Sequence, residues 1–134
     1  MKDTLQAGLM KTSRVEVDAG RTVSFLGEDS RVYSTPFVLH DVEVTSQGLI
    51  NEHLDDSEDT VGSHAEISHL APTPEGLWVE VNVTITEVKG RRIDLAFECR
   101  DAMDTIARGT HTRFVVDKNK TVEHIIAKKQ KAAG

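Results

Sequence analysis

The strongest constraint on the fold is a period-two pattern in the second half of the chain. In residues 77–88, LWVEVNVTITEV, every second residue from Leu77 to Ile85 is a large aliphatic one. After Lys89 and Gly90 the alternation resumes over residues 93–100, IDLAFECR. Such alternation is typical of strands that bury one face, and a Lys-Gly break between two of them predicts a tight hairpin turn. The residues predicted to point inward are Val79, Val81, Val83, Ile85, Ile93, Leu95, Phe97 and Cys99.

Three further segments favour strands. TIARGTHTRFVV (105–116) follows a turn at residues 101–104 and predicts a strand beside the hairpin. TVGSHAEISHL (60–70) predicts another, which ends in the turn-rich APTPEG. Residues 14–26 indicate one bent strand or two short strands.

The clearest helix start is Ser34-Thr35-Pro36. A serine or threonine hydroxyl caps a helix, and a proline at the first helical position loses no hydrogen bond. Because Pro36 has no N–H, the free backbone donors at this start are expected from Phe37 and Val38. Helical spacing then continues to about residue 54. The predicted buried stripe consists of Leu39, Val42, Ser46, Ile50 and Leu54.

Two carboxylates of this helix are predicted to lie on opposite faces. At about 100° per residue, Glu43 falls near the middle of the apolar stripe and Asp41 falls on the outer face. Burial of a carboxylate that is neither paired nor protonated costs on the order of several kcal/mol. Glu43 therefore needs either a partner or a catalytic role. A structural ion pair and a general base both satisfy this requirement.

The element order is a strand, one long helix and then four largely antiparallel strands. A curved antiparallel sheet that wraps a single helix buries the apolar stripe of the helix. The predicted class is therefore α+β, with the architecture known as the hot-dog fold. At 134 residues the chain is expected to form one domain, 1–134, with a basic C-terminal tail at 118–134.

Charge and composition exclude several classes of function. The net charge is -6; the tail carries five lysines and one glutamate, +4, which leaves -10 on the rest of the chain. An acidic body repels nucleic acid phosphates, so no nucleic acid partner is expected. There is no apolar run long enough for a membrane span or a secretory signal, which predicts a cytoplasmic protein. The single cysteine and the histidine spacing predict no metal site.

Three side chains are candidates for chemistry: Thr35 at the positive end of the helix, Glu43, and His69, which ends a predicted strand just before a turn. For Thr35 the alternative is simple capping, and for His69 it is a structural role.

The chain resembles the fluoroacetyl-CoA thioesterase family of hot-dog proteins over about residues 12–117. The resemblance is carried by an ordered set of motifs with constant spacing from Thr35 onward. These are Ser34-Thr35-Pro36 with Glu43, Val61-Gly62, the His69 to Gly76 segment HLAPTPEG, the Val88 to Arg92 segment VKGRR, and the Gly109 to Arg113 segment GTHTR.

The resemblance implies a catalytic threonine, glutamate and histidine at Thr35, Glu43 and His69. It also implies that Gly62 and Arg113 shape the substrate site, and that two subunits pair as a homodimer with clefts at their interface. The implied substrate is a small or medium acyl-CoA, with coenzyme A as part of the substrate and no separate cofactor. The connection GEDSRVY (27–33) is shorter than the phenylalanine-containing stretch that gates the fluoroacetyl-specific enzyme, so fluoroacetyl selectivity is not expected.

Two mechanisms remain open. In the first, Thr35 attacks the thioester, His69 takes its proton and Glu43 orients the imidazole. In the second, Glu43 activates water or attacks directly while Thr35 and His69 position the carbonyl; this version, with Glu43 as the essential base, is slightly favoured. Eight helical residues separate Thr35 and Glu43 by about 12 Å of rise, so the two are not expected to touch. The alternative functions are a non-catalytic module that binds acyl-CoA or an acyl carrier, and an acyl-CoA hydratase or dehydratase.

Overall fold

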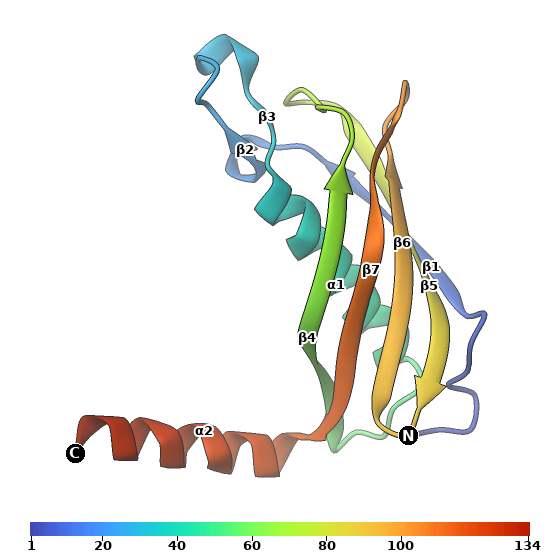
Figure 1. Cartoon of the computed structure of the whole chain (residues 1–134), viewed down its shortest axis with the longest axis vertical. Coiled ribbons are helices and arrows are strands. Elements are labelled where there is room, and N and C mark those ends of the chain that lie inside the picture. Colours follow the sequence, from blue (N-terminus) through green and yellow to red (C-terminus); the bar gives the residue numbers. More distant parts are fainter.

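The computed structural model describes all residues, 1–134, and shows an antiparallel sheet that wraps around one long helix (Figure 1). The five strands of the sheet lie in the order β1-β5-β6-β7-β4. Their bounds are β1 Met10–Glu16, β4 Glu58–His69, β5 Trp78–Lys89, β6 Arg92–Arg100 and β7 Thr105–Asp117. The central helix is α1, Thr35–Asn51. The predicted α+β class and hot-dog architecture are confirmed.

A small ribbon and a terminal helix complete the chain. The ribbon pairs β2, Thr22–Val23, with β3, Val32–Tyr33, and two short 3-10 turns, Ala19–Arg21 and Glu28–Ser30, flank β2 and precede β3. The basic tail forms a second helix, α2, Lys118–Ala133, that leaves the end of β7 and projects away from the body (Figure 1). No helix is long and apolar enough to cross a membrane.

The predicted hairpin is confirmed in detail. β5 and β6 pair antiparallel through a turn in which Gly90 has a φ of 61°, a left-handed conformation that glycine adopts without strain. All eight residues predicted to point inward are buried, and they form the core together with side chains of α1. Burial of the Cys99 thiol in this core raises its pKa to about 12. This cysteine is therefore a core residue and not a reactive one.

The N-terminal segment differs from its prediction. The strand β1 begins at Met10 and ends at Glu16, and it pairs with β5 along this whole length at one edge of the sheet. In the rest of the segment predicted as strand, up to residue 26, only Thr22 and Val23 form a strand, and they belong to the separate ribbon. The ribbon is held over the β4–β5 connection, because the backbone N–H of Tyr33 donates to the carbonyl of Thr73 at 2.9 Å. This contact brings the ribbon to the end of the sheet at which β4 finishes.

The prediction of which face of α1 is buried was wrong for its two carboxylates. Asp41, predicted on the outer face, is only 4% exposed, whereas the side chain of Glu43, predicted within the buried stripe, is 51% exposed. The residues of α1 that are buried are Val38, Asp41, Val42, Thr45, Ser46, Leu49 and Ile50.

Asp41 is buried because it has two partners from the ribbon and its preceding turn. Arg21 donates to both carboxylate oxygens, from Nε at 2.9 Å and from Nη2 at 3.1 Å, and the hydroxyl of Tyr33 donates to the same carboxylate. Burial and the neighbouring Asp41 raise the pKa of Tyr33. A buried carboxylate with such partners is stable where an unpaired one is not. The network ties the ribbon to α1.

β4 and β7 approach closely at Gly109, which leads to a stability prediction. A Cβ at this position would lie 1.9 Å from the carbonyl oxygen of Glu66 and 2.8 Å from the ring of Phe97. We expect Gly109→Ala to lower the free energy of unfolding by at least about 3 kcal/mol, because backbone must move to relieve the overlap. Chemical denaturation measures this change. A matched control is Gly20→Ala, whose Cβ would meet nothing closer than 3.6 Å and should change stability by less than about 0.5 kcal/mol. Equal stability of the two variants would contradict the prediction.

Candidate active site

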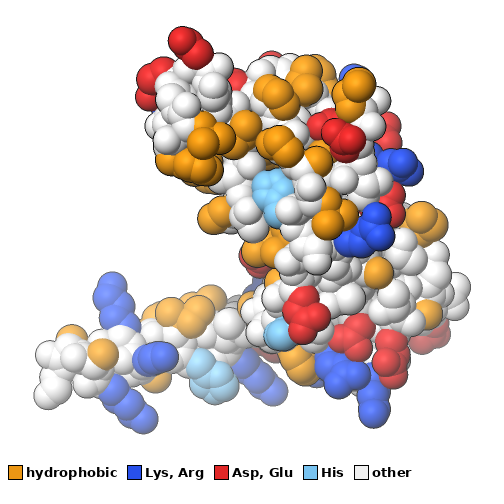
Figure 2. All heavy atoms as spheres, turned by 45° about the horizontal axis from the view of Figure 1, so that its top comes forward, with side chains coloured by type: hydrophobic (Ala, Val, Ile, Leu, Met, Phe, Trp, Pro, Cys, Tyr) orange, Lys and Arg blue, Asp and Glu red, His pale blue; other side chains and the backbone are white.

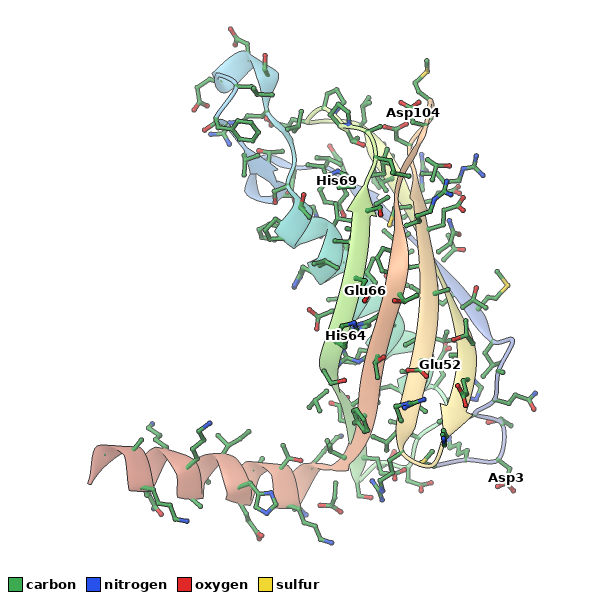
Figure 3. The ribbon with its side chains drawn as sticks, viewed as in Figure 1. Asp3, Glu52, His64, Glu66, His69 and Asp104 are labelled. Carbon is green, nitrogen blue, oxygen red and sulfur yellow. The ribbon has the colours of Figure 1, made fainter.

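Thr35 and His69 form a direct pair. Thr35 is the first residue of α1 and His69 the last residue of β4, and the Thr35 hydroxyl lies 2.7 Å from His69 Nδ1. Figure 3 shows His69 at the end of β4 that lies nearest to the start of α1. Two residues 34 positions apart in sequence are thus brought together by the way α1 packs beside β4.

The cap of α1 is formed by Ser34, which leaves the Thr35 hydroxyl free for His69. The Ser34 hydroxyl accepts from the backbone N–H of Phe37 at 3.4 Å, and the Ser34 carbonyl accepts from the N–H of Val38 at 3.0 Å. The expectation that these two N–H groups would be free donors was therefore wrong. Ser34 caps the helix and the neighbouring Thr35 hydroxyl contacts His69, so Thr35 is available for chemistry.

The environment of His69 favours a neutral imidazole. Burial lowers the pKa of His69 below its ordinary value of 6.5. Its second ring nitrogen, Nε2, is buried and has no hydrogen-bond partner. A neutral imidazole that carries its proton on Nε2 accepts a hydrogen bond at Nδ1. In that tautomer Nδ1 is placed to receive the proton of the Thr35 hydroxyl or of a water molecule in its place.

A cavity of about 420 Å³ opens beside this pair. Its walls come from the ribbon, the start of α1 and the β4–β5 connection, and it is mostly apolar. The lining residues are Val23, Phe25, Val32, Tyr33, Ser34, Thr35, Pro36, His69 and Pro72. Phe25 is 79% exposed, at the mouth of this cavity. Sequence reasoning considered only the connection at 27–33 on this approach and missed Phe25, although the apolar pair Phe25-Leu26 just before that polar turn was a usable signal.

Glu43 belongs to a second cluster, which it forms with residues of β4 and β7. Its Oε2 lies 3.3 Å from Nη1 of Arg113, a residue of β7. Glu43 is half-exposed and Arg113 is buried, so the carboxylate lies at the surface end of the pair. The partner that a carboxylate at this position was expected to need is therefore Arg113.

Arg113 is fixed by contacts on all sides. Its Nε donates to the hydroxyl of Thr60 at 2.9 Å and its Nη2 to the carbonyl of Thr60 at 2.8 Å. Its Nη1 lies 3.3 Å from Nε2 of His111, which accepts because Nδ1 of His111 donates to the carbonyl of His64 at 2.8 Å. Burial lowers the pKa of both Arg113 and His111, although Glu43 opposes the shift of Arg113. The guanidinium therefore presents a rigid positive charge beside Glu43.

Gly62 forms the floor of this second cluster. A Cβ at this position would lie 2.9 Å from Oε2 of Glu43, 3.2 Å from Nη1 of Arg113 and 3.3 Å from Cε1 of His111. No side chain fits there without moving charged groups. The reason for a glycine here is the close approach of these side chains and not its backbone conformation, since a Cβ would displace the end of Glu43.

The five site residues predicted from sequence fall into two groups. Thr35 contacts His69, and Glu43 lies with Gly62 and Arg113, but no hydrogen bond joins the two groups. His69 does not bridge them, because its Nε2 has no partner. The expectation that Thr35 and Glu43 do not touch is confirmed for hydrogen bonding.

Sequence reasoning missed Thr60 and His111, which hold Arg113 in place. His111 stands two positions before Arg113 on one strand, so both side chains point to the same face. That spacing was a usable signal. The role of Thr60 depends on the pairing of β4 with β7, which its own sequence neighbourhood does not show.

Comparisons with known proteins match most of the chain. The sequence model of a family described as fluoroacetyl-CoA-specific thioesterase matches residues 17–119. The fluoroacetyl-CoA thioesterase of Streptantibioticus cattleyicolor is 30% identical over 127 residues, which cover 90% of this chain and 91% of that protein. A solved structure of a fluoroacetyl-CoA thioesterase superposes with a TM-score of 0.87 at 28% identity, over 94% of this chain and 98% of that one.

A thioesterase superfamily member from Thermus thermophilus has the same fold, with a TM-score of 0.89 at 24% identity over 98% of each chain. The family match spans the ribbon, α1 and all of the strands that carry the two groups of site residues. The chain therefore belongs to the fluoroacetyl-CoA-specific thioesterase family of hot-dog proteins.

Proposed function

We propose that this protein hydrolyses the thioester of a small or medium acyl-CoA. The observation that carries the proposal is the 2.7 Å contact between the Thr35 hydroxyl and Nδ1 of a neutral His69 at the wall of an apolar cavity. A hydroxyl in contact with a neutral imidazole is the arrangement of an activated nucleophile. Family membership supports the thioester as the bond that is cleaved.

In the proposed first step, the Thr35 oxygen attacks the thioester carbon while His69 Nδ1 takes the hydroxyl proton. The carbon–sulfur bond then breaks, and the departing CoA thiolate takes that proton from the imidazolium, which leaves the acyl group on Thr35. Water cleaves this ester in the second step and restores the threonine. His69 is thus the proposed base of the first step. The sequence alone had slightly favoured Glu43 as the essential base.

Glu43 is proposed to act on the water of the second step. It is half-exposed, so it can reach solvent, and Arg113 fixes its position. Arg113 is buried and held by Thr60, so its proposed role is to keep Glu43 in position and ionised beside it. Both groups of residues then serve one substrate from different sides.

The cavity sets the size of the acyl group. A volume of about 420 Å³ lies within the range of small-molecule sites, roughly 300–1,000 Å³, and its lining is mostly apolar. A short, uncharged acyl chain fits this description. Phe25 lies in the wall of the cavity, so this chain keeps a phenylalanine on the approach to Thr35.

The working form is proposed to be a homodimer that pairs through β4. β4 is an edge strand, so its outer row of backbone N–H and C=O groups has no partner in the sheet. Six consecutive residues of it, 61–66, are exposed on both faces, whereas β1 at the other edge is exposed only on alternate residues. A second copy at β4 places the clefts at the subunit interface. Acyl-CoA as substrate also favours a cytoplasmic location.

Hydrolysis of acyl-CoA thioesters of two to eight carbons, between pH 5 and 8, tests the proposal. We expect thiol release from short chains, with kcat/KM falling on the acid side through a midpoint below 6.5. The reason is that the base must be neutral and burial lowers the pKa of His69. The rate should then level off toward pH 8, where this group is fully neutral. Tight binding without thiol release would instead indicate a binding module, and water addition to an enoyl-CoA would indicate a hydratase.

A further inference from the structure

Helix α2 carries an apolar stripe that nothing in its own chain covers. Val122, Ile125 and Ile126 recur at helical spacing and are 52%, 61% and 50% exposed. None of the residues of this helix is buried. A single helix of 16 residues is marginally stable in water without a packing partner. The stripe therefore requires an occupant from outside the chain.

The position of α2 relative to β4 indicates which occupant. The helix begins directly after Asp117, which pairs with Glu58 at the first position of β4. In Figure 1 it runs out past the free edge of β4, on the side away from β7. This is the space that a second copy enters when two copies pair through β4. The inference that follows rests on the homodimer of the proposed function.

A two-fold axis perpendicular to the sheet makes the paired β4 strands antiparallel. The start of one β4 at Glu58 then lies level with His69 of the partner subunit, because β4 is 12 residues long and these are its two ends. The helix that begins beside Glu58 consequently passes the end of the partner at which Thr35, His69 and their cavity lie. One subunit thus brings its terminal helix to the active-site entrance of the other.

The surfaces that meet in this arrangement are complementary. The entrance end exposes apolar side chains, including Phe25, Leu26 and Leu70, and Figure 2 shows hydrophobic side chains gathered both on this end and along one face of α2. The same end carries carboxylates without ion pairs, namely Asp29, Glu75 and Asp104. The helix carries lysines without ion pairs, namely Lys120, Lys128, Lys129 and Lys131.

We propose that α2 of one subunit forms part of the active-site entrance of the partner subunit, where its apolar stripe covers the cavity rim and its lysines bind the phosphates of coenzyme A. Coenzyme A is a polyanion, and residues 1–117 carry a net charge of -10. Lys129 continues the apolar stripe by one turn and Lys128 flanks it, so both lie beside the entrance that the stripe covers. The positive helix offsets the repulsion that the acidic body exerts on the substrate.

The first test compares two substrates on one variant. We expect Lys128→Gln with Lys129→Gln to raise KM for the acyl-CoA about tenfold, and to change kcat/KM less than twofold for the acyl-pantetheine thioester, which lacks the nucleotide phosphates. The KM effect should shrink as salt is added. Lys2→Gln with Lys89→Gln removes the same charge elsewhere and should leave KM unchanged. Equal KM values for the two double variants would overturn the proposal.

The second test shows which subunit the helix serves. A heterodimer is purified from one subunit with His69→Ala and one with the two α2 substitutions. Its intact His69 lies in the subunit with the altered helix, whose entrance is covered by the unaltered helix of the other, so we expect a wild-type KM. Placing all three changes in one subunit opposite a wild-type subunit should give the raised KM. The reverse result would mean that each helix serves its own chain and would overturn the proposal. A wild type that hydrolyses no acyl-CoA would refute the proposed function itself.

Discussion

We expect Glu43→Gln to lower kcat at least about a hundredfold on the best acyl-CoA substrate, the lower end of what the loss of a general base costs. Glutamine keeps the shape of the side chain and one acceptor oxygen, so it can still accept a hydrogen bond from Arg113 at the present distance of 3.3 Å. It cannot take a proton from water. The loss should therefore appear in kcat, while KM and the fold stay close to those of the wild type.

Glu52→Gln is the matched control for this prediction. Glu52 follows α1 directly, is about as exposed as Glu43, and makes a 3.2 Å ion pair with Lys11 at the surface. Figure 3 shows it at the opposite end of the molecule from His69. This substitution should leave kcat unchanged. If Glu43→Gln retained kcat within threefold of the wild type, Glu43 would be a structural partner of Arg113 and not a base.

The sheet and its core could be predicted from the sequence because they depend on local patterns. Alternation over residues 79–85 and 93–100 predicted the buried faces of β5 and β6, and Lys89-Gly90 predicted the turn between them. A pattern repeated over many residues averages out single exceptions. The short pieces β2 and β3 have two residues each and leave no such pattern.

The orientation of α1 could not be predicted, because apolar periodicity places a side chain only by its angle around the helix and does not show which carboxylate has partners that stabilise it when buried. Asp41 is buried through contacts with Arg21 and Tyr33, which are 20 and 8 positions earlier in the sequence. Those partners become visible only when the ribbon is folded over the helix. Glu43 is correspondingly turned toward the edge of β4, where Arg113 meets it.

Thr35, Glu43 and His69 were candidates from their places in the sequence, whereas their catalytic roles and the choice of Gly62 and Arg113 came from the family resemblance. Nothing local connects Thr35 with His69, since their contact depends on α1 starting and β4 finishing at the same end of the sheet. The resemblance implied five site residues. It did not show that these residues form two separate groups within one chain, Thr35 with His69 and Glu43 with Gly62 and Arg113.

The central claim is that the Thr35–His69 pair cleaves the thioester. Removing the imidazole by His69→Ala takes away the group that receives the Thr35 proton and returns it to the leaving thiolate. No other histidine contacts Thr35, so no neighbouring base can take over this role. We expect kcat to fall at least about a hundredfold. His53→Ala, just beyond the far end of α1, changes the same residue type at a distance and should leave kcat unchanged.

The most direct test is the initial rate of thiol release from the best acyl-CoA, measured at pH 7.5 with the wild type and His69→Ala at equal concentration. The account predicts steady turnover by the wild type and a rate at least about a hundredfold lower for the variant. A folded His69→Ala variant that turned over within threefold of the wild-type rate would contradict it.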